Sequence, residues 1–123
     1  MNKGIQAEPF DIFWVAFREE DNGTSIQYKT RPALIVTNNT GAKVSPVLTV
    51  LPLSTASNKV GNRFPYHVAI NEVKKLEGSV LLTEQITTVP KSCILGKPIA
   101  KIESNELKKL ISQTLIRQLG LIV

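Results

Sequence analysis

Short apolar runs separated by polar stretches make up most of the chain. These runs are dense in branched and aromatic residues, which suit pleated and largely buried strands. The runs that predict strands are residues 11–17, 31–38, 47–53, 66–70 and 79–83. Roughly six short strands in an open sheet would leave exposed edges, which closure removes. The pattern therefore predicts a closed or half-closed barrel.

The end of the chain has a helical period instead. Apolar side chains recur there at spacings of three and four, at Leu107, Leu110, Ile111, Thr114, Leu115 and Leu119. Ser104 is placed to cap the first amides, and Gly120 is placed to end the helix. We expect a helix over residues 105–119 with one face on the barrel. The expected class is mainly β with this C-terminal helix and α+β accessory elements.

Polar segments separate the predicted strands. Residues 18–30 contain Asn22-Gly23 and predict a long loop or a loose hairpin, and long loops in compact domains are often functional. Residues 38–41 predict a turn, residues 54–63 a second loop, and residues 71–76 one helical turn.

Composition limits the class of protein. The chain has 123 residues, which predicts a single domain over 1–123. With 42% apolar and 20% charged residues, it has the balance of a globular protein. Fifteen Lys and Arg against ten Asp and Glu give a net charge of +5. That charge suits a polyanion or an acidic protein as partner, but a solvated basic surface explains it equally well.

The rarest reactive residues exclude several kinds of site. A single cysteine, Cys93, cannot form an internal disulfide or a thiolate cluster, and a single histidine, His67, excludes most histidine-based metal sites. A neutral His67 could assist proton transfer, but we favour its interpretation as a barrel-wall residue bonded to the backbone. No apolar stretch is long enough to span a membrane, and Met1 to Pro9 contains no signal-like apolar region. We expect a cytoplasmic protein with no metal and no cofactor.

Familiar catalytic motifs are missing too. No glycine-rich phosphate loop precedes a helix, and nothing around His67 resembles a catalytic triad. A site would have to use Arg, Ser or Thr, Glu and Gln. Such a set suits binding a phosphate and stabilising charge without a metal ion.

Three strings carry a resemblance to a known family. They are Arg31-Pro-Ala-Leu-Ile-Val-Thr-Asn38, Val47-Leu-Thr-Val-Leu-Pro-Leu-Ser54 and Ser79-Val-Leu-Leu-Thr-Glu-Gln-Ile86. In this order and spacing, with Asp11-Ile-Phe-Trp-Val before them and Leu119-Gly-Leu after them, they resemble the MazF/PemK toxins of type II toxin–antitoxin systems. The similarity extends over nearly the whole chain.

The resemblance implies an SH3-like barrel of the CcdB/MazF type that forms a homodimer. It implies a metal-independent endoribonuclease that cuts single-stranded mRNA at short sequences. In that reaction the ribose 2′-hydroxyl attacks the adjacent phosphorus and leaves a cyclic phosphate. The implied protein partner is an antitoxin with an acidic, partly disordered segment, which suits the charge of +5.

The resemblance also implies residue roles. Arg31 matches the catalytic arginine, whose guanidinium can bind two phosphate oxygens. Ser54 matches the hydroxyl residue that binds the scissile phosphate, although a turn serine bonded to its own backbone is an equal alternative. Glu84 matches an acidic residue that accepts a proton or orients Arg31, and a structural ion pair is its alternative.

A second group of residues is implied to contact RNA. Ser25 and Gln27 match the substrate-contacting stretch of the first loop. Tyr28 and Lys29 beside them suit base stacking and backbone contact, and Gln85 follows Glu84. A solvated loop is the alternative for the first four. Trp14, with its aromatic neighbours, is interpreted as core or dimer interface rather than as a stacking platform.

Three positions depart from the family pattern. Lys29-Thr30 stands where a glycine pair is frequent, and Phe10 stands where a glycine precedes Asp11. Thr87 replaces the arginine that usually follows Glu-Gln-Ile, which removes a positive charge from the site. This last change favours a second hypothesis, a weak or inactive relative that binds RNA or an antitoxin.

A third hypothesis is a gyrase-binding toxin of the CcdB type on the same barrel. That class relies on a C-terminal tryptophan and isoleucine. This chain ends Leu121-Ile122-Val123 and has its single tryptophan at position 14, so the hypothesis is the weakest of the three.

Overall fold

The computed structural model describes residues 6–21, 25–54, 65–71 and 73–122, and of residues 19–21 and 25–27 it describes the backbone alone. The described strands are β1 (Asp11–Asp21), β2 (Ser25–Ile35), β3 (Val47–Ser54), β4 (His67–Ile70), β5 (Ser79–Leu82), β6 (Thr87–Pro90) and β7 (Ile94–Lys101). The α-helices are α1 (Asn39–Val44) and α2 (Asn105–Leu119). Short 3-10 turns are η2 (Lys74–Leu76), η3 (Thr83–Gln85) and η4 (Lys91–Cys93).

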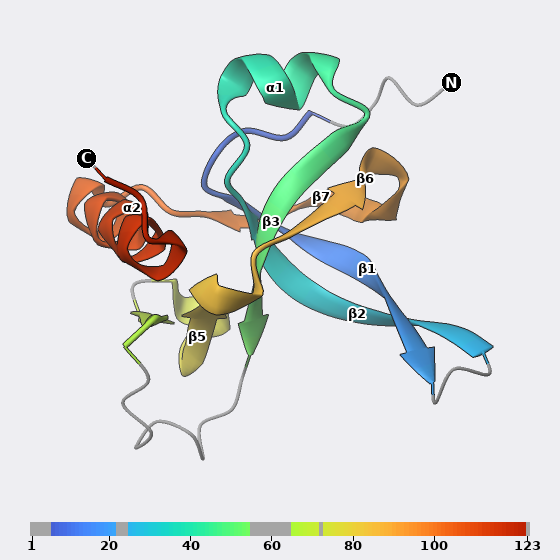
Figure 1. Cartoon of the computed structure of the whole chain (residues 1–123), viewed down its shortest axis with the longest axis horizontal. Coiled ribbons are helices and arrows are strands. Elements are labelled where there is room, and N and C mark those ends of the chain that lie inside the picture. Colours follow the sequence, from blue (N-terminus) through green and yellow to red (C-terminus); the bar gives the residue numbers. More distant parts are fainter. Residues whose placement is uncertain (1–5, 22–24, 55–64, 72, 123) are drawn as a thin grey trace.

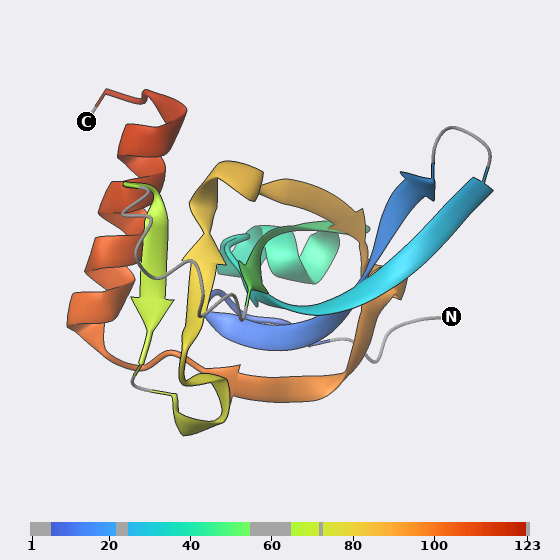
Figure 2. The ribbon, with the colours of Figure 1, turned by 90° about the horizontal axis from the view of Figure 1, so that it is seen from below.

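The strands form one antiparallel sheet that curls around itself (Figures 1 and 2). Its order is β4-β5-β3-β2-β1-β7, and β6 pairs with β3. β6 pairs with β3 at one side of the sheet, and β7 pairs with β1 at the other side. The turn η4 connects β6 directly to β7, so the two sides of the sheet are joined. The prediction of a mainly β, barrel-like fold with a C-terminal helix is confirmed.

The central strands β1, β2 and β3 are buried on both faces. The inner cluster is enclosed by the curled sheet and α1 and consists of Ala7, Phe13, Val15, Ala33, Ile35, Ala42, Leu48, Val50, Val89 and Ile94. The helix-side cluster lies between the sheet and α2 and consists of Ile12, Leu34, Leu51, Leu53, Val68, Ile70, Leu76, Leu81, Ile102 and Ile111. Successive strand residues point to opposite faces, which explains why these strands read as nearly continuous apolar runs.

The helix α2 has the predicted bounds and the predicted caps. Ser104 Oγ accepts a hydrogen bond from the Leu107 amide at 3.1 Å. Gly120 ends the helix with a φ of 71°, a left-handed conformation that glycine adopts without a steric cost. The helix lies alongside β4 (Figure 2).

The packed face of α2 is narrower than its sequence period predicts. Ile111 and Thr114 are buried, but Leu110 and Leu119 are exposed. Their assignment to the packed face is therefore wrong. The helix covers β4 and η3 at one end of the sheet, so a single stripe of side chains is enough to close the helix-side cluster.

The long polar segment after the first predicted strand is a regular hairpin rather than a loop. β1 and β2 pair continuously from Asp21↔Ser25 to Ile12↔Leu34. Beyond the body of the sheet this hairpin extends away from the rest of the chain (Figure 1). Its strands carry polar residues there because they have no second layer to cover, and so they lack the apolar alternation that predicts a strand. Residues 22–24, including Asn22-Gly23, lie outside the described residues.

Two further predictions need correction. Residues 38–41 are not a simple turn: Asn38 caps α1, and its Oδ1 accepts a hydrogen bond from the Gly41 amide at 2.8 Å. The sequence also fails to predict β6 and β7. Pro90, Gly96 and Pro98 interrupt this region, and most of β7 is exposed, so its apolar pattern is weak. Pairing with β3 and β1 forms these strands instead.

Phe10 has an unusual backbone conformation at the position where the family has glycine. Its φ is 74°, and it is the non-glycine residue with positive φ among the described positions. A left-handed conformation costs about 1–2 kcal/mol for a residue with a side chain. Two backbone hydrogen bonds offset this cost, from the Phe10 amide to Ile35 O at 2.8 Å and from the Ile102 amide to Phe10 O at 3.0 Å. The ring packs against the helix-side cluster, and Lys108 Nζ lies 5.4 Å from its centroid.

Ion pairs of Lys101, at the end of β7, connect this strand to Asp11 and Glu8, at and just before the start of β1. Lys101 Nζ lies 2.9 Å from Asp11 Oδ1 and 3.0 Å from Glu8 Oε1. The hydrogen bond to buried Asp11 is the main reason that the pKa of Lys101 is raised above its ordinary value of 10.5. A raised lysine pKa stabilises the fold fully below 10.5, and the contribution is lost as pH rises through the folded value.

Replacement of this lysine gives a pH-dependent prediction. Lys101→Met should lower the free energy of unfolding near neutral pH by about 0.5 kcal/mol, because solvent screens an ammonium that is 39% exposed. Urea unfolding of both proteins at several pH values measures the difference. It should be constant up to about pH 9 and shrink above about pH 10.5. A difference that grows at high pH would contradict this account.

Candidate functional site

The pairing of β2 with β3 places Arg31 and Ser54 at one end of their ladder. The two strands pair at Ala33↔Pro52, Leu34↔Leu51 and Ile35↔Val50. The ladder ends at Ala33↔Pro52, and Arg31 and Ser54 each lie two residues beyond that last pair, at the same end of the ladder. Both residues are half-buried. Arg31 also marks the point where β2 has left β3 and pairs with β1 alone, through Val15↔Arg31.

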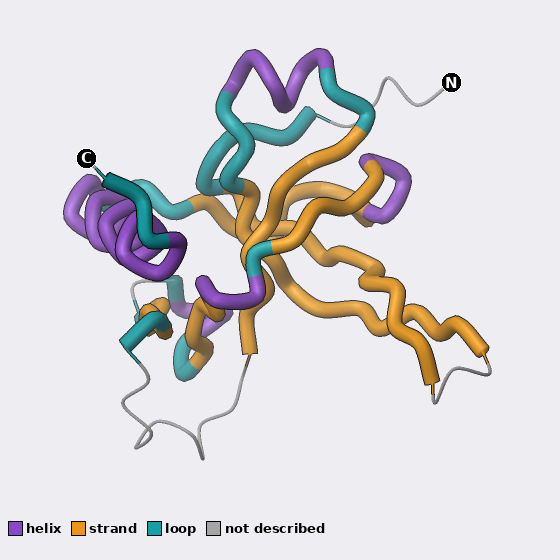
Figure 3. The backbone as a smooth tube through the Cα atoms, viewed as in Figure 1, coloured by secondary structure: helices purple, strands orange, loops and turns teal. Residues whose placement is uncertain are grey.

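The turn η3 brings Glu84 to the same end of β3. β6 pairs with β3 from Val47 to Val50, and β5 pairs with it at Leu53 and Ser54. Because η3 joins β5 to β6, it lies beside β3 between these two ladders (Figure 3). Within η3, Glu84 is half-buried and Gln85 is exposed. Arg31, Ser54 and Glu84 therefore come from three consecutive neighbours in space: β2, β3 and the turn beside β3.

A histidine that the sequence leaves without a marked partner lies against Glu84. His67 Nε2 is 3.2 Å from Glu84 Oε2, and the two side chains are 21% and 26% exposed. β4 and β5 pair through His67↔Leu82, two residues before Glu84. No local motif links residues 17 positions apart, so only the pairing of β4 with β5 could have predicted this contact.

The other oxygen of Glu84 is buried without a partner. Among the described residues, none donates a hydrogen bond to Oε1. A buried acceptor without a donor costs about 1–3 kcal/mol. Gln118 Oε1 on α2 is in the same state, so the missing donor alone does not mark a functional group, and Glu84 is a candidate because it also lies beside β3.

The four hairpin residues implied to contact RNA lie apart from this group. Tyr28 and Lys29 are exposed on β2, opposite Arg18 and Phe17 of β1. Ser25 and Gln27 belong to the same strand, and their side chains lie outside the described part of the structure. The hairpin thus forms an arm beside the site rather than part of its floor (Figure 1).

A hollow of about 320 Å³ joins this arm to β6. Arg18 and Tyr28 line it from the hairpin, and Thr87 and Cys93 line it from the opposite side. Thr87 is the residue that replaces the expected arginine. The hollow is therefore lined by one guanidinium, from Arg18, by the exposed ring of Tyr28 and by Thr87, where the expected arginine is absent.

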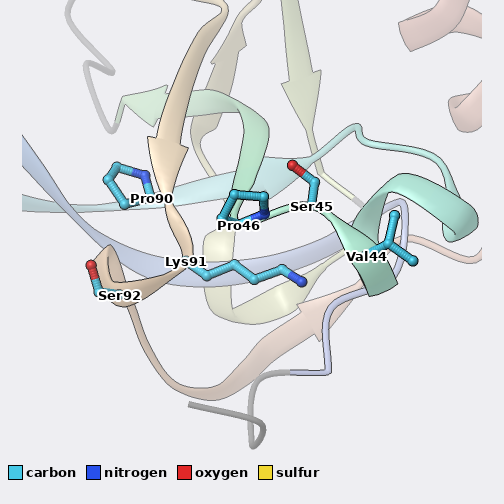
Figure 4. A pocket seen from close by; sticks show the side chains of 6 residues that line it. All are labelled: Val44, Ser45, Pro46, Pro90, Lys91 and Ser92. Atoms are coloured by element: carbon cyan, nitrogen blue, oxygen red, sulfur yellow. The ribbon is translucent and has the colours of Figure 1, made fainter. Parts of the chain in front are cut away.

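A second hollow, of about 370 Å³, lies on another part of the surface (Figure 4). It is lined by the end of α1, by Pro46 and Pro90, and by Lys91 and Ser92. None of the residues implied to act on RNA lines it. Size alone would have pointed to the wrong place.

Trp14 is not a core residue. It is 45% exposed and pairs with Pro32 on one side and with Leu95, also exposed, on the other. This apolar row, Pro32, Trp14 and Leu95, crosses three strands on the face opposite to the inner cluster. The interpretation of Trp14 as a core residue is therefore wrong, and its interpretation as part of a dimer interface stays a prediction.

Comparison with known families identifies the chain. The fold and the site define a small toxin-like barrel, and the family of PemK-like, MazF-like toxins of type II toxin–antitoxin systems matches residues 8–119. The chain belongs to this family.

Curated relatives agree with this assignment. The chain is 40% identical over 75 residues to the endoribonuclease MazF of Staphylococcus epidermidis, and 41% identical over 69 residues to that of Staphylococcus saprophyticus. These matches cover 59% and 54% of this chain. They span 61% and 56% of the relatives' own lengths.

Solved structures share the fold at low sequence identity. An endoribonuclease in complex with its cognate antitoxin, from a mycobacterial species, is 21% identical with a TM-score of 0.68, over 100% of this chain and 99% of that one. MazF in a MazE–MazF crystal structure from Deinococcus radiodurans is 16% identical with a TM-score of 0.73, over 94% and 97%. Within the described residues, no helix is both long and apolar enough to cross a membrane.

Replacing Glu84 tests whether its carboxylate is kept at the expense of stability. Glu84→Met removes a buried acceptor that has no donor among the described residues and retains similar bulk. We expect the free energy of unfolding to rise by about 1 kcal/mol. Denaturant unfolding measures it, with Glu77→Met, an exposed carboxylate nearby in the chain, as the matched control. A clear fall for Glu84→Met alone would mean that stabilising contacts hold the carboxylate.

Proposed function

We propose that this chain is the toxin of a type II toxin–antitoxin pair and cuts single-stranded mRNA without a metal ion. The observation that carries the proposal is that β2, β3 and η3, which bear Arg31, Ser54 and Glu84, adjoin at one end of the β2–β3 ladder. The endoribonuclease names of the staphylococcal relatives support it. The cytoplasm is the compartment where such a substrate is found.

The proposed reaction is transesterification within the RNA strand. The 2′-oxygen forms a bond to the adjacent phosphorus, and the bond from phosphorus to the 5′-oxygen breaks. One proton leaves the 2′-hydroxyl for a base, and one proton reaches the departing 5′-oxygen. The first products are a 2′,3′-cyclic phosphate and a free 5′-hydroxyl, so no water or metal is consumed in this step.

The site offers groups for charge stabilisation, phosphate binding and removal of the 2′-hydroxyl proton, and solvent supplies the proton that reaches the 5′-oxygen. Arg31 binds the phosphate oxygens, where charge increases as phosphorus becomes pentacoordinate. Ser54, at the same end of the ladder, donates a hydrogen bond to the same phosphate. Glu84 accepts the 2′-hydroxyl proton. The exposed Tyr28, Lys29 and Gln85, with Ser25 and Gln27 in the same arm, contact the flanking nucleotides.

Two protein partners belong to this proposal. An antitoxin with an acidic, partly disordered segment fits a chain of net charge +5, and related folds were solved in complex with antitoxins. A second copy of the chain is the other partner. The apolar row at Trp14 is the described surface best suited to that contact.

The residue at position 87 supports a second candidate function. Thr87 lies in the hollow beside Tyr28 where the family usually has an arginine. A loss of charge there favours a relative that binds RNA or an antitoxin but cuts weakly or not at all. The gyrase-binding alternative has no comparable support in the described residues.

Cleavage in the presence of excess EDTA tests the proposal. The wild-type chain should cut a long single-stranded RNA at a short recurring sequence and leave cyclic phosphate ends. Arg31→Ala should lower the rate by about 100-fold or more, because the charge gained by the phosphate is no longer stabilised. Arg117→Ala, which removes the same charge from the exposed face of α2, should cut like the wild type. RNA that stays intact across many sequences would overturn the proposal in favour of the inactive relative.

The oligomeric state tests the apolar row. Trp14→Glu places a charge in the middle of this row and should convert a dimer into a monomer, as measured by light scattering after gel filtration. Val44→Glu is the control, because Val44 is also apolar and exposed but lies at the end of α1. A dimer that persists in the folded Trp14 variant would place the interface elsewhere.

A further inference from the structure

The contact between His67 and Glu84 joins two rigidly related segments. Tyr66 and Thr83 immediately precede the two residues, and Tyr66 O accepts two hydrogen bonds from Thr83. One comes from the Thr83 amide at 3.2 Å, and the other comes from its hydroxyl at 2.6 Å. Thr83 is fully buried. The backbone positions from which His67 and Glu84 extend are therefore fixed relative to each other.

The carboxylate of Glu84 has one described anchor. Its Oε2 lies 3.2 Å from His67 Nε2, whereas its Oε1 has no hydrogen-bond partner among the described residues. An ionised carboxylate can only accept hydrogen bonds, so Nε2 carries the hydrogen when Glu84 is charged. The orientation of the carboxylate consequently depends on the imidazole.

The pair also lies where a ligand can reach it. Both side chains are partly exposed, at 21% and 26%, while the residue after His67 and the residue before Glu84 are buried. A structural role for this contact would contribute little, because taking the carboxylate partly out of water opposes the gain from a single hydrogen bond. An unpaired buried oxygen on one partner lowers that gain further.

We propose that His67 is a positioning residue that holds the Glu84 carboxylate in the orientation required for proton transfer. This inference rests on the proposed function, because Glu84 acts there as the proton acceptor. Without the imidazole, the carboxylate turns among its rotamers and occupies the productive one for a smaller fraction of the time. The chemical step slows, and RNA binding, to which His67 does not contribute, stays the same.

Three variants of His67 separate positioning from other roles. His67→Leu removes the hydrogen bond and should lower kcat about 10- to 100-fold with KM within about twofold. His67→Gln carries an amide N–H at nearly the distance of Nε2 from the backbone and should retain most of the activity. His67→Asn has the same amide on a shorter side chain, does not reach Oε2, and should behave like the Leu variant.

The comparison of Gln with Asn is the decisive one, because the two variants share polarity and differ by one methylene group. Equal activity of both, at the wild-type level, would overturn the inference. Equal loss in both would also overturn it, since the amide N–H would then fail to replace the imidazole. Unfolding free energies of all variants separate a loss of fold from a loss of rate, and the Gln and Asn variants remain informative if the Leu variant does not fold.

A double-mutant cycle tests whether His67 acts through Glu84. In a Glu84→Ala background, measured in single turnover with protein in excess, His67→Leu should change the residual rate by less than about twofold. A full additional loss would show that His67 touches the RNA or the reacting atoms itself. If the wild type cuts RNA with dependence on Arg31 but not on His67, this inference alone fails. If the wild type cuts no RNA, the proposed function fails and this inference fails with it.

Discussion

Burial of β1, β2 and β3 on both faces is the constraint on which the rest of this structure depends. Neighbouring residues such as Ile12 and Phe13 pack into separate clusters, so a shift of one residue in the register would exchange two complete sets of core side chains. Both clusters would then be lost together. Arg31 and Ser54 lie two residues beyond the last pair of the β2–β3 ladder, so the core fixes the point from which both segments leave that ladder.

The site forms where this two-sided burial ends. β2 pairs with β3 only near its C-terminal end, and at Arg31 it has already left β3 to continue into the hairpin. β3 changes partner at the same level, from β6 to β5, and η3 fills the gap. Divergence of strands exposes backbone and side chains that the core does not need, so polar residues can be placed there without loss of packing.

The sequence predicts those parts of the fold that have an apolar period. The bounds of the central strands and of α2 were predicted to within a few residues. Runs of apolar residues indicate the strands, and the apolar period with the caps Ser104 and Gly120 indicates the helix. β6 and β7 were not found, because proline and glycine interrupt them and ladder pairing alone defines them. For residues 18–30 the sequence left a long loop and a loose hairpin open for the same reason, since the outer half of the hairpin covers no core.

The candidate site was predictable only as far as the strings that resemble the family. Arg31 begins the first of those strings, Ser54 ends the second and Glu84 lies near the end of the third, and their roles stay predictions. The contact of His67 with Glu84 was not predicted, because the two residues are 17 positions apart and a ladder between two short strands creates the contact. A long-range contact of this kind leaves no local signal, whatever its importance.

Stability and chemistry make opposite demands on the end of β3. The inner and helix-side clusters, the caps of α2 and the Lys101 group all satisfy their polar atoms or bury apolar ones. At Glu84 the chain instead keeps a buried oxygen that lacks a donor among the described residues, next to a double hydrogen bond that fixes the backbone on both sides of the pair. A rigid frame on both sides holds the carboxylate in one orientation, which suits the proton transfer that we propose for it.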